Sequence, residues 1–270
     1  MIDLHSHTTA SDGTFSPAQL IEEAHARKLR VLAITDHDTL AGFDEARPLA
    51  GDLELVCGIE LSVKLHGTSV HLLGYFPKGA SADFRRNIME IQEGRRDRNR
   101  RLILRLRELG LPITLDEVQA RGRGMTGRPH FAQVLVSKGY ARTIQEAFDR
   151  YLDELAQGYV YRQEPQFAEG ACLIRESGGI ASLAHPVRVK GDVAVLLPEL
   201  CAAGLNAIEA FHSDHSVEDT RHFLELAKRH SLMVTGGSDF HGEVKPGLQL
   251  GSGRDGNLQI PTDLWERMKA

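Results

Sequence analysis

Runs of apolar and β-branched residues recur along the chain and predict seven strands. These runs span residues 2–5, 31–35, 53–57, 69–76, 180–184, 206–210 and 232–235. Most are separated by helical patterns, such as the one that begins at the capping box of Ser16 and Gln19 and the one over residues 216–229. Strands that alternate with helices are typical of a mostly parallel sheet, and seven of them favour a small, irregular β/α barrel.

The alternation fails between residues 81 and 165, where the pattern is helical throughout. A long helix is predicted over residues 82–109, and two further capping boxes begin at Thr114 and Thr143. We therefore expect an α/β fold in which residues 1–80 and 166–270 form a seven-stranded (β/α)7 barrel. Residues 81–165 are expected to form an all-helical domain inserted between the fourth and fifth strands, and residues 261–270 a closing helix.

The composition is that of an ordinary soluble globular protein, with 41% hydrophobic and 26% charged residues in 270. No apolar run approaches the roughly 18 residues of a membrane span. Three distant cysteines, Cys57, Cys172 and Cys201, argue against a disulfide scaffold and against a thiolate zinc site. A reducing cytoplasm fits this cysteine content, and no signal-like segment precedes Asp3.

The charge is unevenly distributed along the chain. The net charge is −5, yet residues 81–130 contain twelve arginines and seven acidic residues. An acidic body with an arginine-rich segment suggests a small anionic ligand held between them, although a solvated basic helix is the alternative. Stable binding of a nucleic-acid duplex is not expected, because it requires a larger basic surface.

Many of the thirteen histidines lie at or near the ends of predicted strands. With neighbouring acids they form the set His5, His7, Asp12, His37, Glu60, His71, His185, Asp239 and His241. The carboxyl ends of strands in a parallel barrel meet on one face, so we expect these nine side chains to converge. Asp36 and Asp38 flank His37, and the favoured interpretation of Asp38 is a helix cap.

Nitrogen and oxygen ligands in this number predict a metal centre. His5 and His7 alternate along a strand and point to the same face, so both can bind one ion. A carboxylate such as Glu60 can bridge two ions. Nine ligands exceed the three or four that one ion needs, which predicts two or three ions, and Mn²⁺, Zn²⁺ and Fe²⁺ all suit this ligand chemistry. A lone His71 within a strand would instead be a core histidine.

Five segments together resemble the polymerase and histidinol phosphatase (PHP) family of metallophosphoesterases. They are residues 3–13 (DLHSHTTASDG), 34–38 (ITDHD), 58–60 (GIE), 184–186 (AHP) and 237–241 (GSDFH). The resemblance covers essentially the whole chain and implies a distorted seven-stranded barrel with three divalent ions, Mn²⁺ being favoured. It also implies three ligand sets: His5, His7, Glu60 and Asp239; Glu60, His71 and His185; and Asp12, His37 and His241.

Within the helical segment, residues 126–132 (TGRPHFA) and 158–160 (GYV) resemble one subgroup of that family. This subgroup removes the 3′-phosphate of 3′,5′-nucleotide bisphosphates and also acts as a 5′-to-3′ exonuclease on short 5′-phosphorylated oligonucleotides. Tyr161 departs from the proline expected after the second motif. Arg128 and His130, at a helix start, are expected to bind the phosphate that is not cleaved.

The expected reaction is phosphoester hydrolysis by a metal-bound hydroxide held by Glu60, Asp239 and His241. Asp36 is expected to orient a ligand histidine, and His212 is a candidate general acid. Glu209 and Phe211 are candidates to contact ribose and base, with packing at a strand end as the alternative. Two other functions stay open: a phosphatase of another small monoester such as histidinol phosphate, and a non-catalytic metal-containing module that binds nucleic acid or a partner.

Overall fold

The computed structural model describes residues 1–122 and 124–270, and it contains one seven-stranded sheet in sequence order. Its strands are β1 (Ile2–Asp3), β2 (Val31–Ile34), β3 (Glu54–Leu65), β4 (Thr68–Phe76), β5 (Ile180–Leu183), β6 (Ala207–His212) and β7 (Met233–Gly237). The bridge between Ser6 and Phe240 brings the two edges of the sheet together. Backbone hydrogen bonds from Leu4 to Gly236 and from Asp239 to His5 reinforce this closure. The predicted α/β barrel is therefore confirmed.

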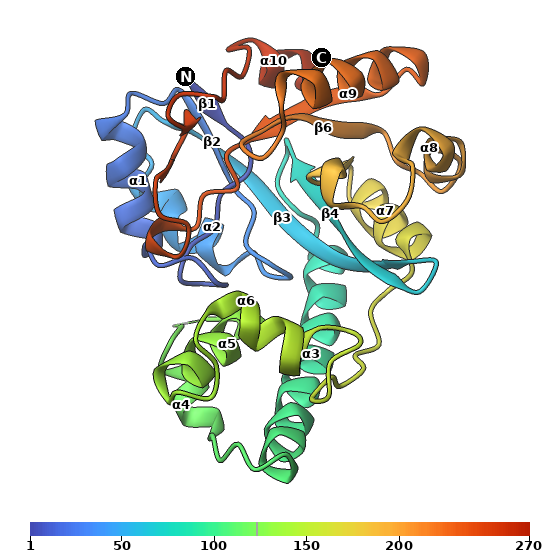
Figure 1. The fold of residues 1–270 in the computed structure, drawn as a ribbon. Helices are drawn as coiled ribbons and strands as arrows, with labels where there is room; N and C mark the ends of the chain where they lie inside the picture. Colours follow the sequence, from blue (N-terminus) through green and yellow to red (C-terminus); the bar gives the residue numbers. More distant parts are fainter. Residues whose placement is uncertain (123) are drawn as a thin grey trace.

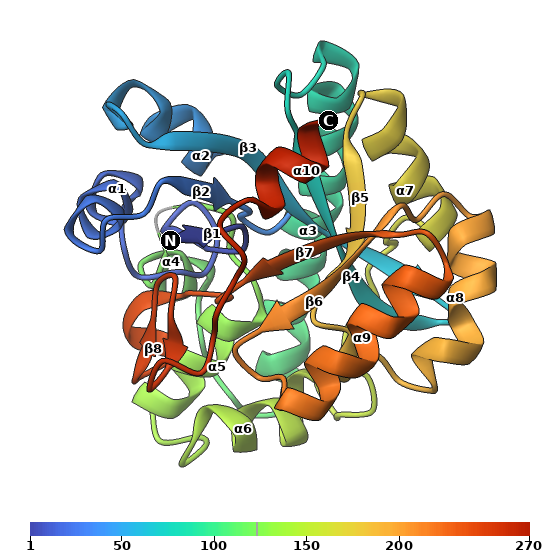
Figure 2. The same ribbon diagram turned by 90° about the horizontal axis from the view of Figure 1, so that it is seen from above.

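Helices surround the sheet and close one end of it (Figures 1 and 2). The outer helices are α1 (Pro17–Ala26), α2 (Ala41–Ala46), α7 (Phe167–Glu176), α8 (Val193–Ala202) and α9 (Val217–Arg229). The predicted capping box of Ser16 and Gln19 is present, because each side chain accepts the other residue's backbone N–H. The terminal helix α10 (Leu264–Lys269) packs Leu264, Trp265 and Met268 against apolar side chains of the strands.

The β3–β4 hairpin changes the predicted strand pattern. The third strand was expected over residues 53–57, but β3 runs to Leu65 and pairs along its length with the antiparallel strand β4. His66 and Gly67 form the two-residue turn, and both have positive φ angles, as such hairpin turns require. Because β4 runs against its neighbours, its first half lies at the edge where β2 and β5 end.

Between β4 and β5 the chain forms α3 (Ala82–Glu108), α4 (Leu115–Gln119), α5 (Arg128–Ser137), α6 (Ile144–Ala147) and a π-helical turn (Phe148–Leu152). The first half of α3 packs Phe84 and Ile88 against the barrel. Its second half packs Leu102 and Leu106 into a separate apolar cluster with Phe131 and other helical residues. This cluster lies on the opposite side of the sheet from α10 (Figure 1). Of the described helices, none is both long and apolar enough to span a membrane.

Candidate metal centre and anion cavity

Glu60 lies at the centre of the histidines that the sequence predicted would converge. One of its oxygens is 3.2 Å from His5 Nε2, 3.0 Å from His7 Nε2 and 3.3 Å from His37 Nδ1. The other is 2.8 Å from His71 Nδ1 and 2.9 Å from His185 Nε2. Glu60 was expected after the third strand, but it lies within β3. It meets His71 because β4 is antiparallel, and not because His71 ends a strand.

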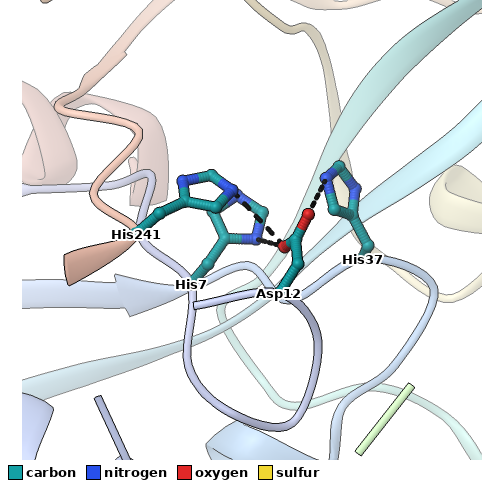
Figure 3. Close-up of side chains that lie close together, drawn as sticks. All are labelled: His7, Asp12, His37 and His241. Atoms are coloured by element: carbon teal, nitrogen blue, oxygen red, sulfur yellow. Dashed lines mark ion pairs between the residues drawn. The ribbon is translucent and has the colours of Figure 1, made fainter. Parts of the chain in front are cut away.

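Asp12 is a second carboxylate around which histidines gather (Figure 3). One carboxylate oxygen lies 3.4 Å from His241 Nε2 and 3.7 Å from His7 Nδ1, while the other lies 3.7 Å from His37 Nε2. Asp12 belongs to a loop after β1, His37 follows β2, and His241 follows β7. The two ends of the barrel sheet therefore supply one compact group.

Asp239 contributes a third carboxylate, with a left-handed backbone at φ +57°. Its Oδ1 lies 3.5 Å from both His5 Nε2 and His7 Nε2 and 3.3 Å from His241 Nδ1. Its Oδ2 instead accepts hydrogen bonds from Lys245 at 2.5 Å and Arg188 at 3.0 Å. One oxygen thus faces the histidines while cations hold the other in place.

The donor set fits divalent metal ions. Among the described residues, side-chain ligand atoms come within 4.8 Å of one another in four groups: His7, Asp12, His37 and His241; His5, His7, Glu60 and Asp239; His37, Glu60 and His71; and His5, Glu209 and His212. Several ring nitrogens and one carboxylate oxygen in these groups are buried without a hydrogen-bond partner among those residues, including His7 Nε2, His37 Nδ1 and Asp12 Oδ1. Buried polar atoms are normally paired, so these nitrogen and oxygen atoms fit the role of ligands to a divalent ion.

The pKa values of the histidines in this centre shift in both directions, because burial lowers the pKa of two of them, whereas Glu209, Glu60 and Asp239 raise the pKa of His5 well above its usual value against the effect of burial. Burial lowers the pKa of His37 to about 3 and that of His185 to about 4, which keeps both imidazoles neutral. Burial disfavours ionised Glu60, but His37, His71 and His5 hold the pKa of Glu60 well below its usual value. Neutral imidazoles and ionised carboxylates are the forms that bind a metal.

Glu209 occupies a place that the sequence did not reveal. It was a candidate for contact with ribose, but it is fully buried in β6. One oxygen is 2.9 Å from His5 Nδ1, and the other accepts the His185 backbone N–H at 2.6 Å. Burial opposes its ionisation, yet His5 lowers the pKa of Glu209 to about 2. Glu209 therefore orients two histidines of the centre, as carboxylates behind metal-binding histidines commonly do.

Asp36 and His212 are the other two predicted supporting residues of the centre. Asp36 accepts the Thr8 N–H at 2.8 Å and the Ser11 hydroxyl at 2.5 Å, and Ser11 Oγ lies 3.4 Å from His7 Nδ1. Asp36 thus reaches a histidine only through Ser11. His212 Nδ1 accepts the Asp214 N–H, and its Nε2 lies 3.5 Å from Asp239 Oδ2.

Phe211 packs with apolar residues of both barrel clusters. It lines a hollow with Leu224 and Met233, away from the histidines. The structure therefore does not bring Phe211 together with the other predicted site residues.

A cavity of about 230 Å³ separates two unlike sets of side chains. We call Asp12, His37 and His71, with the histidines and acids behind them, the histidine wall. We call Arg95, Arg98, Arg128 and Arg162 the arginine wall. The remaining lining residues are Ser62, Lys64, Ser69, Pro129, Phe148, Glu154, Tyr159, Val160 and Glu164. Tyr159 and Val160 belong to the second subgroup motif, while Tyr161 is largely exposed beside them.

The arginine wall carries more positive charge than its acidic partners neutralise. Asp38 accepts hydrogen bonds from Arg95 and Arg162, and these two arginines hold the pKa of Asp38 well below normal against the effect of burial. Arg98 and Arg128 form no ion pair with any described carboxylate. Burial, together with the charges of Arg95 and Arg128, lowers the pKa of Arg98 well below its usual value. Such an excess of buried donors suits an anion.

Arg128 and His130 lie at the start of α5 but differ in position. Arg128 lines the cavity, and its Nη1 donates to the Leu152 carbonyl at 3.3 Å. His130 does not line the cavity: its Nδ1 accepts the Gly127 N–H at 3.0 Å and caps the helix. Arg128 therefore lies where it can contact an anion in the cavity, whereas His130 does not line that cavity.

Arg95, Arg98 and Arg162 were not singled out from the sequence. A signal for two of them exists, because Arg95 and Arg98 occupy the buried face of α3 that also carries Phe84, Ile88 and Leu102. Arginine at such positions is unusual and marks a buried polar contact. Arg123, another arginine of the rich segment, lies outside the described residues.

Comparison with known proteins identifies the family of this chain. The PHP domain family matches residues 3–163. The chain belongs to the PHP family. The PHP barrel is shared with a Bifidobacterium adolescentis structure described as a metal-dependent phosphoesterase, with a TM-score of 0.84 and 32% identity over 98% of this chain and 94% of that one. The predicted family and the prediction of an enzyme that acts on phosphoesters are confirmed.

Three PHP relatives carry names for specific activities. A 3′,5′-nucleoside bisphosphate phosphatase of Chromobacterium violaceum is 33% identical over 100% of this chain and 96% of its own length. A 5′-3′ exoribonuclease of Haemophilus influenzae is 32% identical over 88% of this chain and 89% of its own. A phosphoribosyl 1,2-cyclic phosphate 1,2-diphosphodiesterase of Eggerthella lenta is 34% identical over 89% of this chain and 94% of its own.

Proposed function

We propose that this PHP enzyme removes the 3′-phosphate from 3′,5′-nucleoside bisphosphates and also shortens 5′-phosphorylated oligonucleotides from the 5′ end. One observation carries the proposal: a single cavity has histidines and an aspartate that suit metal ions on one wall and four arginines on the other. A substrate with two phosphates can engage both walls at once. The phosphatase and exoribonuclease named among the relatives support this substrate class.

The histidine wall would hold three divalent ions, with Mn²⁺ favoured. His5, His7, Glu60 and Asp239 would bind the first ion, Glu60, His71 and His185 the second, and Asp12, His37 and His241 the third. The groups of neighbouring ligand atoms support the first and third sets directly, and the distances from Glu60 to His71 and His185 support the second. Bound there, the ions would supply Lewis acidity to the phosphoryl group and acidify a water molecule.

The chain's own residues would position the substrate. Arg98 and Arg128 are not paired with described carboxylates, so their guanidinium groups would bind the phosphate that is not cleaved. Holding this remote group would orient the 3′-phosphate towards the histidine wall, and the binding energy would thereby contribute to catalysis. Residues 81–165 would then serve as a cap over the barrel that supplies all four residues of the arginine wall.

A phosphatase of a single-phosphate substrate, such as histidinol phosphate, would leave the arginine wall without an anion. The test is phosphate release from 3′,5′-adenosine bisphosphate and from histidinol phosphate, with the nucleotide product identified by chromatography. We expect faster hydrolysis of the bisphosphate and adenosine 5′-monophosphate as its product. Preference for histidinol phosphate, or the 3′-monophosphate as product, would contradict the proposal. Catalytic turnover of either substrate excludes a non-catalytic module.

A further inference from the structure

Asp38 connects the two walls of the cavity. It follows His37 directly, and its backbone N–H donates to the Glu60 carbonyl at 3.0 Å. Its carboxylate Oδ1 accepts the Ser62 N–H at 2.9 Å, so the side chain is fixed against β3. The sequence suggested that Asp38 caps a helix. That interpretation is wrong, because α2 begins after Leu40 and has no side-chain cap.

The second carboxylate oxygen of Asp38 binds the arginine wall. Oδ2 accepts Arg95 Nε at 3.0 Å, and it also contacts Arg95 Nη2. It accepts Arg162 Nη1 at 2.8 Å as well. Arg95 comes from α3 and Arg162 from the segment that leads back to α7, so one carboxylate joins both connections of the helical segment to the barrel. Asp38 is completely buried, which strengthens these charge-assisted bonds.

We infer that Asp38 is a positioning residue that fixes the arginine wall relative to the histidine wall and thereby sets the enzyme's preference for substrates with two phosphates. This inference rests on the proposed function. The distance between the cleaved and the retained phosphate of a nucleotide is limited by its sugar. A wall that is free to shift would therefore bind the second phosphate without aligning the first.

If Asp38 only compensated the positive charge of the arginines, its neutralisation would have the opposite effect on phosphate binding. Removal of a negative charge beside four arginines raises the local positive potential, and affinity for a phosphate would then increase. Loss of positioning instead lowers kcat/KM for the bisphosphate. The sign of the change therefore separates the two roles.

The test uses Asp38→Asn and a matched control. The backbone of Asp38 is left-handed, with φ at +53°, and asparagine tolerates this conformation, so the substitution changes charge without straining the chain. The control is Asp44→Asn. Asp44 lies in α2 and also joins the barrel to an arginine of α3, because Arg85 donates to it at 2.7 and 2.9 Å, but this pair lies outside the cavity.

For Asp38→Asn we expect kcat/KM on 3′,5′-adenosine bisphosphate to fall about 10- to 100-fold, with a clearly smaller loss on adenosine 3′-monophosphate. Asp44→Asn should stay within about twofold of the wild type on both substrates. An unchanged or increased kcat/KM for Asp38→Asn would overturn the inference. An equal loss on the two substrates, or an equal loss in Asp44→Asn, would also overturn it, because either result indicates a general role in folding.

Calorimetric binding of adenosine 5′-monophosphate separates this inference from the proposed function. Binding by the wild type should weaken in Asp38→Asn and stay unchanged in Asp44→Asn, whatever reaction the enzyme catalyses. If the wild type binds this nucleotide but does not hydrolyse the bisphosphate, the proposed function fails and the binding data still decide the role of Asp38. Equal binding by the wild type and Asp38→Asn would overturn the inference alone.

Discussion

The histidine wall and the arginine wall of the cavity balance their charges in different ways. In the histidine wall, acids and imidazoles contact one another, and Glu60 alone lies within 3.3 Å of five histidine rings. In the arginine wall, four guanidinium groups share few acids, chiefly Asp38 and Glu164. The first wall is rich in lone pairs and suits cations, whereas the second is rich in N–H donors and suits anions. A phosphate group with its metal ions satisfies both.

The largest effect is expected from neutralising the centre of the histidine wall. Glu60→Gln keeps the size of the side chain but removes the charge that five histidines face, so bound metal should be lost. We expect phosphate release to fall about 10³-fold or more, with metal content measured by elemental analysis and the fold by circular dichroism. Glu209 contacts His5 through Nδ1, the ring nitrogen that does not face Glu60. Glu209→Gln should therefore have a smaller effect and weaken metal affinity about 10- to 100-fold.

The control for Glu60→Gln is Glu22→Gln, an exposed acid on α1 without a described side-chain contact. It should retain wild-type activity and metal content. Full metal content in an inactive Glu60→Gln protein would show that Glu60 acts in chemistry without holding ions. Full activity in that variant would remove Glu60 from the centre altogether.

The histidine wall was largely predictable from the sequence because its members follow strands, and parallel strands end at one edge. His71 was expected to join this set, yet it does so through an antiparallel hairpin whose turn at His66 and Gly67 was not recognised. Glu209 was noticed, but its buried contact is with His5, which lies 204 positions away in the sequence. Local patterns contain no information about such a distant partner.

Of the arginine wall, the sequence predicted the excess of positive charge and Arg128, but not the other three arginines. Twelve arginines crowd residues 81–130, and α3 is charged around most of its surface, so composition could not select Arg95 and Arg98. Arg162 lies outside that segment and reaches the cavity because Asp38 holds it. These contacts depend on how the helical segment packs on the barrel, which is a property of the tertiary structure.

The second prediction tests whether the arginine wall binds the phosphate that is not cleaved. Arg128→Ala should cost about 2–4 kcal/mol of transition-state stabilisation on 3′,5′-adenosine bisphosphate, because a charge-assisted pair of bonds is lost. The loss on adenosine 3′-monophosphate should be much smaller. The matched control is Arg101→Ala, since Arg101 is an exposed arginine of α3 paired with Asp97. Equal losses of kcat/KM on the two substrates would assign Arg128 to the reacting phosphate or to folding.

The last prediction concerns stability, and its effect is the smallest. Arg98 is 6% exposed, and its Nε has no hydrogen-bond partner among the described residues. Burying a charge without a partner destabilises a folded protein, so Arg98→Met should raise the free energy of unfolding of the ligand-free enzyme by about 1–3 kcal/mol. For a protein of this size that corresponds to an increase in Tm of about 2–10 °C. The same substitution should weaken binding of adenosine 5′-monophosphate about 10- to 100-fold, since one guanidinium group of the anion site is removed.

Arg95→Met is the matched comparison on the same helix face. It leaves Asp38 with a single arginine and should lower Tm, because a buried carboxylate loses two of its hydrogen bonds. Thermal unfolding and calorimetric titration of both variants measure these effects. A decrease in Tm for Arg98→Met would mean that Arg98 has a stabilising partner, and the arginine wall would then balance its charges internally, as the histidine wall does.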